Sequence, residues 1–280
     1  MDNAIGVLTS AKSFIVLYGA GASASAGVAT FRHSAEQPEE GQPSANTALL
    51  KDRSNWDWKQ ALGTSETQTS NWLKWVASQQ AFLETKTPTK FHFWLNLEKY
   101  GKIREIFTMN VDDLERKAGL IPEYNYYPLH GSFFNLICLT CQIHQKELQE
   151  KDKEFLNQGQ FPPCIACAMN RKDPRTRSRR TMGMRPGILL YHDNPSTYIH
   201  DRVKKVRDHY KGKRKVDVFL VVGTSIPNEV HHLKATLADL IGCAKKSVYA
   251  DISPSPNLNL FDYTVQISSD ELALHLQDSS

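Results

Sequence analysis

The sequence lacks the features that would place the protein in or across a membrane. Among its 280 residues there is no N-terminal apolar segment of the signal-peptide type and no apolar run long enough to cross a bilayer. Excess charge of one sign is also missing: 34 Lys and Arg stand against 30 Asp and Glu, and a net charge of +4 does not indicate nucleic-acid binding. We therefore expect a soluble protein of the nucleus or cytoplasm that binds neither membranes nor nucleic acids directly.

Cysteine is scarce, with five residues in the chain, but four of the five are concentrated between positions 136 and 182. They form two Cys-x-x-Cys pairs separated by 22 residues, Cys138 with Cys141 and Cys164 with Cys167. Inside cells thiols stay reduced, and this spacing is typical of structural zinc sites; the alternative is four unconnected thiols. Four thiolates leave no position for water, so we predict a Zn²⁺ ion that stabilises the fold and takes no part in catalysis.

Short apolar runs that end in small or polar residues predict β-strands along the rest of the chain. They cover residues 14–18, 102–110, 216–224 and 246–253, and helical patterns cover residues 89–101 and 229–242. Strands that alternate with helices are typical of an α/β fold. We predict a Rossmann-like, doubly wound parallel sheet whose ligand binds at the carboxyl ends of the strands.

Two segments do not fit this alternation of strands and helices. Residues 33–84 are polar and then rich in tryptophan, which predicts a loop followed by helices whose Trp side chains pack in the core. Residues 136–182 carry the cysteine pairs, and the remaining Cys243 is predicted to be a core residue. We assign residues 1–135 and 183–280 to the Rossmann-like domain, with 33–84 as a loop and helical insertion, and residues 136–182 to a small zinc module.

The stretch Tyr18–Arg32, YGAGASASAGVATFR, follows the first predicted strand and consists mostly of small residues. Gly19, Gly21 and Ala24 fit the dinucleotide fingerprint G-x-G-x-x-G/A, in which helix N–H groups receive a pyrophosphate. The alternative is a tight strand-to-helix turn without a ligand. A dehydrogenase would place an acid at the end of a second strand about 20 residues further on. The glutamates at positions 36, 39 and 40 follow no strand-like run, which argues against a dehydrogenase.

Six segments follow one another in a recognisable order around the four cysteines. They are Tyr18–Arg32, Pro88–Gly119, LHGSF at 129–133, MRPGILLYHD at 184–193, VVGTSI at 221–226 and ADISPSP at 250–256. Together they resemble the sirtuins, the NAD-dependent protein deacylases, over the chain from Phe14 to Leu276. The first segment is similar to the family's GAG-(I/A)-S-x-x-x-G-I-P-D-F-R loop, and MNVDD within the second is similar to its Q-N-I-D sequence.

The resemblance implies a reaction without redox chemistry. In sirtuins the amide oxygen of an acyl-lysine displaces nicotinamide from the ribose of NAD, and a histidine then removes a proton from a ribose hydroxyl. His130 matches that histidine, and an imidazole that titrates near neutrality suits this task. Asn110 matches the catalytic asparagine, and Asp112 matches the acid that binds the nicotinamide carboxamide. The alternatives are a structural histidine and an asparagine that caps the next helix.

The resemblance also implies which residues bind NAD and an acylated-lysine protein or peptide. The residues expected to contact NAD are Gly19, Ala20, Gly21, Ser23, Val28, Thr30, Phe31, Arg32, Met109, Asn110, Asp112, His130, Gly223, Thr224, Ser225, Asp251 and Ser268. The peptide is expected to add as a strand, and the residues expected to contact it are Leu189, Tyr191 and His192.

Some residues depart from the family pattern near the reactive ribose. Ala29 and Thr30 replace Pro-Asp, Met109 replaces a glutamine, and Asp251 replaces an asparagine. The loss of these polar contacts beside the ribose predicts slow turnover or a changed acceptor substrate. Three functions are compatible with this pattern: an NAD-dependent lysine deacylase, an NAD-dependent ADP-ribosyltransferase or other NAD-consuming enzyme, and a catalytically weak NAD-binding module. The deacylase is favoured because the catalytic residues are present.

Overall fold

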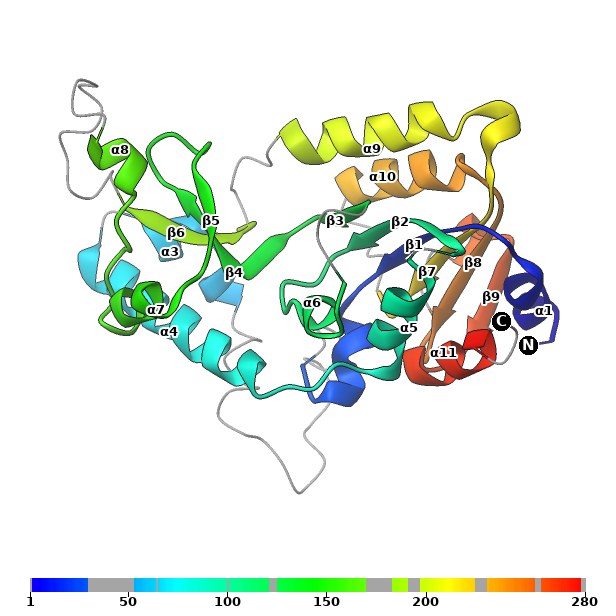
Figure 1. The fold of residues 1–280 in the computed structure, drawn as a ribbon, viewed down its shortest axis with the longest axis horizontal. Helices are drawn as coiled ribbons and strands as arrows, with labels where there is room; N and C mark the ends of the chain where they lie inside the picture. Colours follow the sequence, from blue (N-terminus) through cyan, green and yellow to red (C-terminus); the bar gives the residue numbers. More distant parts are fainter. Residues whose placement is uncertain are drawn as a thin grey trace.

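The central element of the fold is a six-stranded sheet in which all neighbouring strands are parallel. The computed structural model describes residues 2–29, 53–63, 65–99, 101–120, 125–169, 183–190, 197–224, 231–254 and 258–277. The strand order is β3-β2-β1-β7-β8-β9 (Figure 1). The bounds are β1 Phe14–Tyr18, β2 Ile103–Thr108, β3 Tyr126–Pro128, β7 Val216–Val222, β8 Ala244–Asp251 and β9 Tyr263–Gln266. The chain winds outward from β1 in one direction and then from β7 in the other, so the topological switch point lies between these two strands.

Both faces of this sheet are covered by helices. Phe14, Val16 and Tyr18 of β1 belong to one buried cluster, and Ile15 and Leu17 belong to another, because successive side chains of a strand point to opposite faces. The helices on the first face are α1 Asp2–Ser10, α5 Lys90–Glu98 and α11 Ser269–Gln277; those on the second face are α9 Thr197–His209 and α10 His231–Ile241 (Figure 1). A strand that is buried on both faces must be apolar throughout, as the sequence FIVLY is.

A second, smaller sheet lies beyond the end of β3, and β4 leads into it (Figure 1). It has the order β5-β4-β6 and is antiparallel. The strands are β4 Gly131–Cys138, β5 Gln145–Glu147 and β6 Met184–Ile188, and the neighbouring helices are α3 Trp58–Leu62, α4 Glu66–Glu84, α7 Glu150–Asn157 and α8 Ile165–Met169. Trp56, Trp72 and Trp75 are buried together with Phe133 of β4 in one cluster, so these tryptophans pack as predicted.

The predicted fold class is confirmed, since the structure has a doubly wound parallel sheet with a helical insertion and a cysteine-bearing module. The strands predicted at 102–110 and 216–224 end earlier than expected, at Thr108 and Val222. The second strand ends there because Gly223 has a φ of 58°, which is not extended backbone. Strands β3 and β9 were not predicted, since they have only 3 and 4 residues. None of the helices in the described part of the chain has the length and apolarity needed to cross a membrane.

Candidate functional site

The loops that follow β1 and β7 pack directly against each other at the switch point. The N–H of Gly19 donates to the carbonyl of Val222 over 3.0 Å, and the N–H of Gly21 donates to the carbonyl of Gly223 over 2.7 Å. A Cβ atom on Gly21 would lie 2.7 Å from the Cα of Gly223, and one on Gly19 would lie 2.5 Å from the Cβ of Thr224. Gly223 also has a φ of 58°, in the left-handed region. Glycine is therefore required here by packing within the protein, even without a ligand.

The segment after Gly19 forms a 3₁₀-helix, η1 Ala20–Ala26, where the dinucleotide fingerprint assumes an α-helix. Ser23 is completely buried in η1, Ala20 is half-buried, and Val28 packs in the tryptophan-rich cluster beyond the end of η1. The hydroxyl of Thr89 donates to the carbonyl of Ala22 over 3.0 Å. This contact joins η1 to the start of α5 and positions the loop relative to the sheet.

Asn110 and Asp112 follow the end of β2 and are both buried. The Nδ2 of Asn110 donates to the hydroxyl of Ser23 over 3.0 Å, so its side chain does not cap the next helix, α6 Leu114–Lys117. The Oδ1 of Asp112 accepts the N–H of Leu114 over 3.1 Å. Burial raises the pKa of Asp112, while hydrogen bonds from Ser23 and the Leu114 N–H and the charge of Lys117 act in the opposite direction.

His130 lies between β3 and β4 and is half-buried. Its Nδ1 is 3.0 Å from the backbone carbonyl oxygen of Met109. A carbonyl oxygen can only accept, so Nδ1 carries the hydrogen and the neutral ring has its lone pair on Nε2. The backbone carbonyl of His130 accepts the N–H of Leu189 over 2.9 Å, which places a residue predicted to bind substrate next to the candidate base.

Met109 occupies the position where the sirtuin pattern has a glutamine, and it contacts three of the loops at this edge. Its N–H donates to the carbonyl of Tyr18 over 2.9 Å, and its carbonyl accepts from His130. The hydroxyl of Thr224 donates to its sulfur over 3.2 Å. The methionine, in the loop after β2, therefore contacts the end of β1 and the segments that follow β3 and β7, although it offers no amide to a ligand.

Asp251 ends β8 at the same edge of the sheet and is buried. Its Oδ2 accepts from the hydroxyl of Tyr249 over 3.3 Å, and its Oδ1 accepts the N–H of Ser253 over 2.9 Å. Ser268, another predicted NAD contact, accepts the N–H of Glu271 over 3.2 Å and so caps α11. Six predicted site residues, Thr30, Phe31, Arg32, Tyr191, His192 and Ser225, lie outside the described residues.

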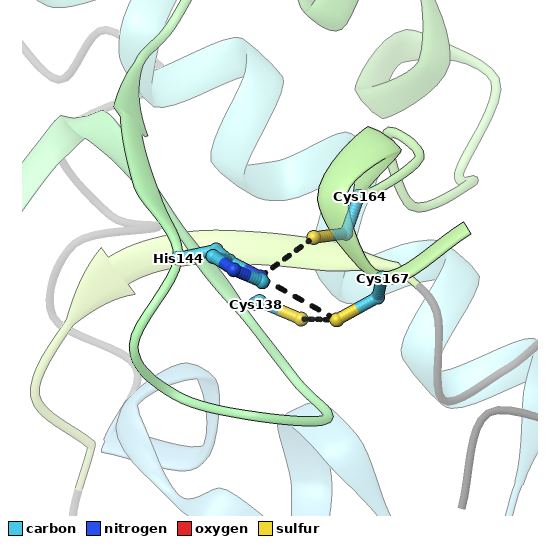
Figure 2. Close-up of side chains that lie close together, drawn as sticks. All are labelled: Cys138, His144, Cys164 and Cys167. Carbon is cyan, nitrogen blue, oxygen red and sulfur yellow. Dashed lines mark hydrogen bonds between the residues drawn. The ribbon is translucent and has the colours of Figure 1, made fainter. Parts of the chain in front are cut away.

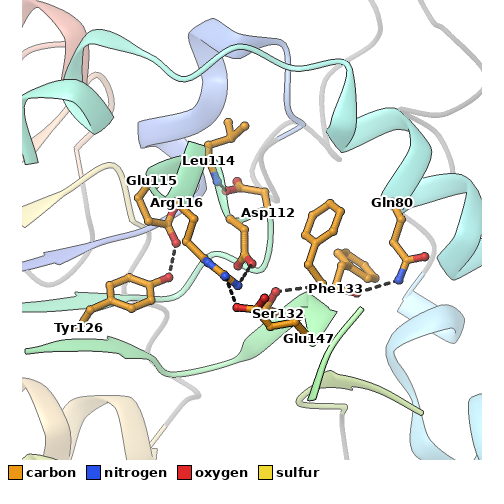
Figure 3. Close-up of polar contacts among 11 residues, drawn as sticks. Gln80, Asp112, Leu114, Glu115, Arg116, Tyr126, Ser132, Phe133 and Glu147 are labelled. Atoms are coloured by element: carbon orange, nitrogen blue, oxygen red, sulfur yellow. Dashed lines mark hydrogen bonds and ion pairs between the residues drawn. The ribbon is translucent and has the colours of Figure 1, made fainter. Parts of the chain in front are cut away.

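A buried acidic group behind Asp112 was not predicted from the sequence. Glu115 is fully buried and accepts a hydrogen bond from the hydroxyl of Tyr126 (Figure 3). Burial raises the pKa of Glu115 to about 8, and the charges of Asp112 and Asp113 add to this shift. The sequence signal for this acidic group was three acids within four residues after a strand. Arg116 lies beside them and forms ion pairs with Asp113 and Glu147.

The four predicted zinc ligands come together at the loop after β4 and at α8. The Sγ of Cys138 lies 3.5 Å from that of Cys167, which is 3.9 Å from the Sγ of Cys141. The Sγ of Cys164 belongs to the same group. Burial raises the pKa of Cys138, but hydrogen bonds from the N–H groups of Cys141 and Thr140 and from the neighbouring thiols bring it to about 6. A buried thiol that ionises readily suits metal binding, so the donor set fits Zn²⁺.

His144 is also part of this cluster and was not predicted. Its Nδ1 lies 3.1 Å from the Sγ of Cys141. It lies 3.5 Å from the Sγ atoms of both Cys164 and Cys167 (Figure 2). The spacing Cys141-x-x-His144 equals that of the two cysteine pairs, and it is the feature of the sequence that indicates His144 as a further metal ligand. The structure therefore gathers five potential donors where the sequence analysis predicted four.

Residues 19–231 match the sequence model of the Sir2 family. The chain belongs to this family. One Sir2 relative is the NAD-dependent protein deacetylase hst4 of Emericella nidulans, 27% identical over 284 residues that cover 94% of this chain and 46% of that protein. The NAD-dependent protein deacetylase of Bacillus subtilis is 27% identical over 281 residues, which cover 99% of this chain and 98% of that protein. The chain thus spans less than half of the fungal relative.

Solved structures of Sir2 proteins have the same fold. A complex of a Sir2 homologue with NAD superposes with a TM-score of 0.66 at 23% identity and covers 100% of this chain and 94% of that chain. This likeness extends over both the parallel sheet and the cysteine-bearing part. The resemblance stated from the six sequence segments is therefore confirmed.

Proposed function

We propose that this Sir2-family chain is an NAD-dependent protein lysine deacylase, which transfers the acyl group of a lysine side chain to ADP-ribose and releases nicotinamide. One observation carries the proposal: Asn110, Asp112 and His130 all lie at the carboxyl edge of the parallel sheet, beside the glycine loops of the switch point. Ligands of doubly wound sheets bind at this edge. The substrates would be acylated proteins or peptides of the nucleus or cytoplasm.

The residues at this edge fit NAD by their chemistry. The loops after β1 and β7 meet there, and the carboxylate of Asp251 ends β8, where an acid can accept from ribose hydroxyls. The carboxylate of Asp112 is an acceptor suited to the N–H groups of a carboxamide. When bound, NAD would supply the ribose carbon that accepts the acyl oxygen as nicotinamide leaves. Among the described residues, those that we propose to hold it are Gly19, Ala20, Gly21, Ser23, Val28, Met109, Asn110, Asp112, His130, Gly223, Thr224, Asp251 and Ser268.

His130 is assigned as the general base. The hydrogen bond from its Nδ1 to the carbonyl of Met109 over 3.0 Å leaves the lone pair on Nε2 and fixes the orientation of the ring. A neutral imidazole in this tautomer accepts a proton from a hydroxyl at Nε2 and can return it later. Nδ1–H can donate to the backbone carbonyl of Met109 in both the neutral ring and the imidazolium, so this hydrogen bond can persist while Nε2 takes up and returns the proton.

Asn110 is assigned to orient the reacting groups. Its Nδ2 is held by the hydroxyl of Ser23 over 3.0 Å, so the side chain has one orientation and its Oδ1 is an acceptor for a ribose hydroxyl or for water. An uncharged amide does this without adding a charge to a site where Asp112 is already buried. Preorganisation of this kind lowers the barrier without a change in structure during the reaction.

The edge of β6 is assigned to the peptide. β6 is the outer strand of the three-stranded sheet in the part of the chain that is described, and an extended peptide adds to such an edge through main-chain hydrogen bonds. Leu189 follows β6 directly, is half-buried, and is bonded through its N–H to the carbonyl of His130. An acyl-lysine that reaches past this leucine would arrive beside the proposed base. Zn²⁺ at the cysteine cluster would stabilise the β4 and α8 region, away from this chemistry.

The experiment that tests the proposed function is a product analysis with NAD and a panel of lysine peptides carrying acyl chains of different length. We expect deacylated peptide, nicotinamide and acyl-ADP-ribose to form in equal amounts, and His130→Ala to form no deacylated peptide. Peptide or protein that carries ADP-ribose, free ADP-ribose without deacylation, or NAD binding without any product would contradict the proposal. Mass spectrometry distinguishes all of these results.

A further inference from the structure

The zinc cluster holds more donors than a tetrahedral ion accepts. Zn²⁺ at a structural site takes four ligands. The donor atoms of Cys138, His144, Cys164 and Cys167 all lie within 4.8 Å of one another, and Cys141 does not belong to this mutually close set. The Sγ of Cys141 nevertheless lies 3.9 Å from Cys167 and 3.1 Å from the Nδ1 of His144. One of the five donors must therefore stay outside the coordination shell.

The distances indicate which donors compete. With bonds of about 2.3 Å to sulfur and about 2.0 Å to nitrogen, a tetrahedral zinc site has S···S edges of roughly 3.8 Å and S···N edges of roughly 3.5 Å. The Nδ1 of His144 is 3.5 Å from both Cys164 and Cys167, as a ligand would be. The Sγ of Cys141 is 3.9 Å from Cys167, also as a ligand would be. Cys141 and His144, however, are 3.1 Å apart, which is a hydrogen-bond contact and too short for an edge.

We propose that Cys138, Cys164 and Cys167 hold the zinc ion permanently and that either Cys141 or His144 fills the fourth position. The two alternatives lie at one corner of the site and bond to each other when only one is a ligand. This proposal concerns the zinc module and does not depend on the deacylase activity. It replaces a fixed four-cysteine site by one with an interchangeable fourth ligand.

Burial separates the three permanent ligands from the two alternatives. Cys138, Cys164 and Cys167 are 0%, 2% and 5% exposed and belong to one buried cluster. Cys141 is half-buried, and His144 is exposed. Ligands in a packed core cannot turn away from the ion without opening cavities, whereas side chains at the surface change rotamer at little cost.

The loop between β4 and β5 presents both alternatives from one tight turn. The N–H of Cys138 donates to the carbonyl of His144 over 2.9 Å, and the N–H of Gln142 donates to the carbonyl of Cys138 over 3.0 Å. Gln142 itself has a φ of 55°. The N–H of His144 lies 3.5 Å from the Sγ of Cys141, so the turn supports a thiolate at that position as well. Exchange of the fourth ligand thus requires side-chain rotation on a turn whose ends stay bonded.

Zinc content in purified variants tests the proposal. We expect Cys141→Ser and His144→Ala each to keep one zinc ion per chain, and the double variant to lose it. Cys164→Ser is the matched control, and this single substitution should be enough to abolish zinc binding. Loss of zinc in either Cys141→Ser or His144→Ala would overturn the proposal, because the remaining residue would then have failed to fill the fourth coordination position. Retention of zinc in the double variant would overturn it too.

A second measurement uses the unmodified protein, in case a variant fails to fold. Zinc-loaded wild-type protein is treated with iodoacetamide, and the modified cysteines and the bound zinc are measured by mass spectrometry of the intact and digested protein. We expect Cys141 to be alkylated first while zinc stays bound. In His144→Ala, Cys141 should be protected several-fold, because it is then the permanent fourth ligand. Alkylation of Cys141 only together with zinc loss in the wild type would overturn the proposal.

Discussion

The carboxamide of Asn110 donates to the hydroxyl of Ser23 over 3.0 Å, across 87 positions of the sequence. The contact joins the loop after β2 to η1 after β1, and both partners are buried. Ser23 also bonds to Asp112, so a single hydroxyl orients two of the residues assigned to the reaction. Its position explains why a completely buried serine stands among small apolar residues in this loop.

Replacement of Ser23 by alanine should therefore damage the site more than the fold around it. A buried polar group that loses its partner costs about 1–3 kcal/mol, and we expect the free energy of unfolding of Ser23→Ala to fall by about this amount. Nicotinamide release should fall at least tenfold. Ser25→Ala is the control, because Ser25 lies in the same 3₁₀-helix and is exposed, bonded to Asp270. Equal effects of the two substitutions would contradict the assignment.

His130→Ala should stop deacylation while NAD still binds. Loss of a general base typically costs on the order of 10² to 10⁴ in rate. In the proposed reaction the base acts after nicotinamide has left, so exchange of labelled nicotinamide into NAD should persist in the variant. Calorimetric titration with NAD and the exchange assay measure the two retained steps. Deacylation at the wild-type rate would exclude His130 as the base.

Glycine at the switch point should be irreplaceable for reasons of packing. In Gly21→Ala the new Cβ would lie 2.7 Å from the Cα of Gly223, which is backbone and cannot move aside. Gly223→Ala adds the strain of a φ of 58°. Both variants should lose stability and NAD affinity. Gly6→Ala is the control: its Cβ meets nothing within 4 Å in helix α1, and we expect a gain of about 0.5–1 kcal/mol.

The buried Glu115 should make the protein less stable as the pH rises. Burial, with the charges of Asp112 and Asp113, raises the pKa of Glu115 from 4.5 to about 8 in the folded protein. Between these values the folded chain keeps a proton that the unfolded chain has lost, so the free energy of unfolding falls with increasing pH. Glu115→Gln should remove this loss and stabilise the protein by on the order of 2 kcal/mol near pH 8.

Replacement of Tyr126, the hydrogen-bond partner of Glu115, should increase the loss of stability with pH. The hydroxyl of Tyr126 donates to Glu115 and lowers the pKa of that carboxyl. Tyr126→Phe removes the donor, so the pKa of Glu115 should rise and the loss of stability with pH should become steeper. Urea unfolding of the wild type and both variants from about pH 5 to about pH 8 gives the three slopes. The same slope in all three proteins would show that Glu115 is not the titrating group.

Zinc should stabilise the fold through the buried cysteines. Cys164→Ser should lose the metal and lower the melting temperature together, since metal binding and local folding are coupled. Cys243→Ser is the matched control: Cys243 is also buried, but in the core between the main sheet and α10, and it should lose stability without losing zinc. Metal analysis and thermal unfolding check both results. Full stability in zinc-free Cys164→Ser would contradict a structural role.

Local patterns in the sequence were sufficient for the fold class and for the cysteines of the metal cluster. The run FIVLY predicted β1 to the residue, because a strand buried on both faces must be apolar throughout. The tryptophans and Cys243 were predicted to be core residues: Trp56, Trp72, Trp75 and Cys243 are buried, and Trp58 is half-buried against the same cluster as the other three tryptophans. The two Cys-x-x-Cys pairs predicted the metal cluster because ligands three positions apart lie on one turn. The boundaries of the zinc module at 136 and 182 stay a prediction.

Contacts between distant segments were decided only by the tertiary structure. The carbonyl that orients His130 belongs to Met109, and the hydroxyl that holds Asn110 belongs to Ser23; neither pairing has a periodicity that a sequence could display. The glycines of the first loop fit a dinucleotide fingerprint in the sequence, but only the fold shows that their Cβ positions are filled by the loop after β7.

His144 shows, within one short loop, the difference between what the sequence determined and what the tertiary structure decided. The sequence by itself determined that Cys141 and His144 are three positions apart, and thus that one turn presents both. Only the fold brought the two cysteines at α8 to that turn and placed the imidazole 3.5 Å from the Sγ atoms of Cys164 and Cys167. The physical reason is that backbone periodicity depends on neighbours along the chain, whereas donor distances of a few ångströms depend on how separate elements pack.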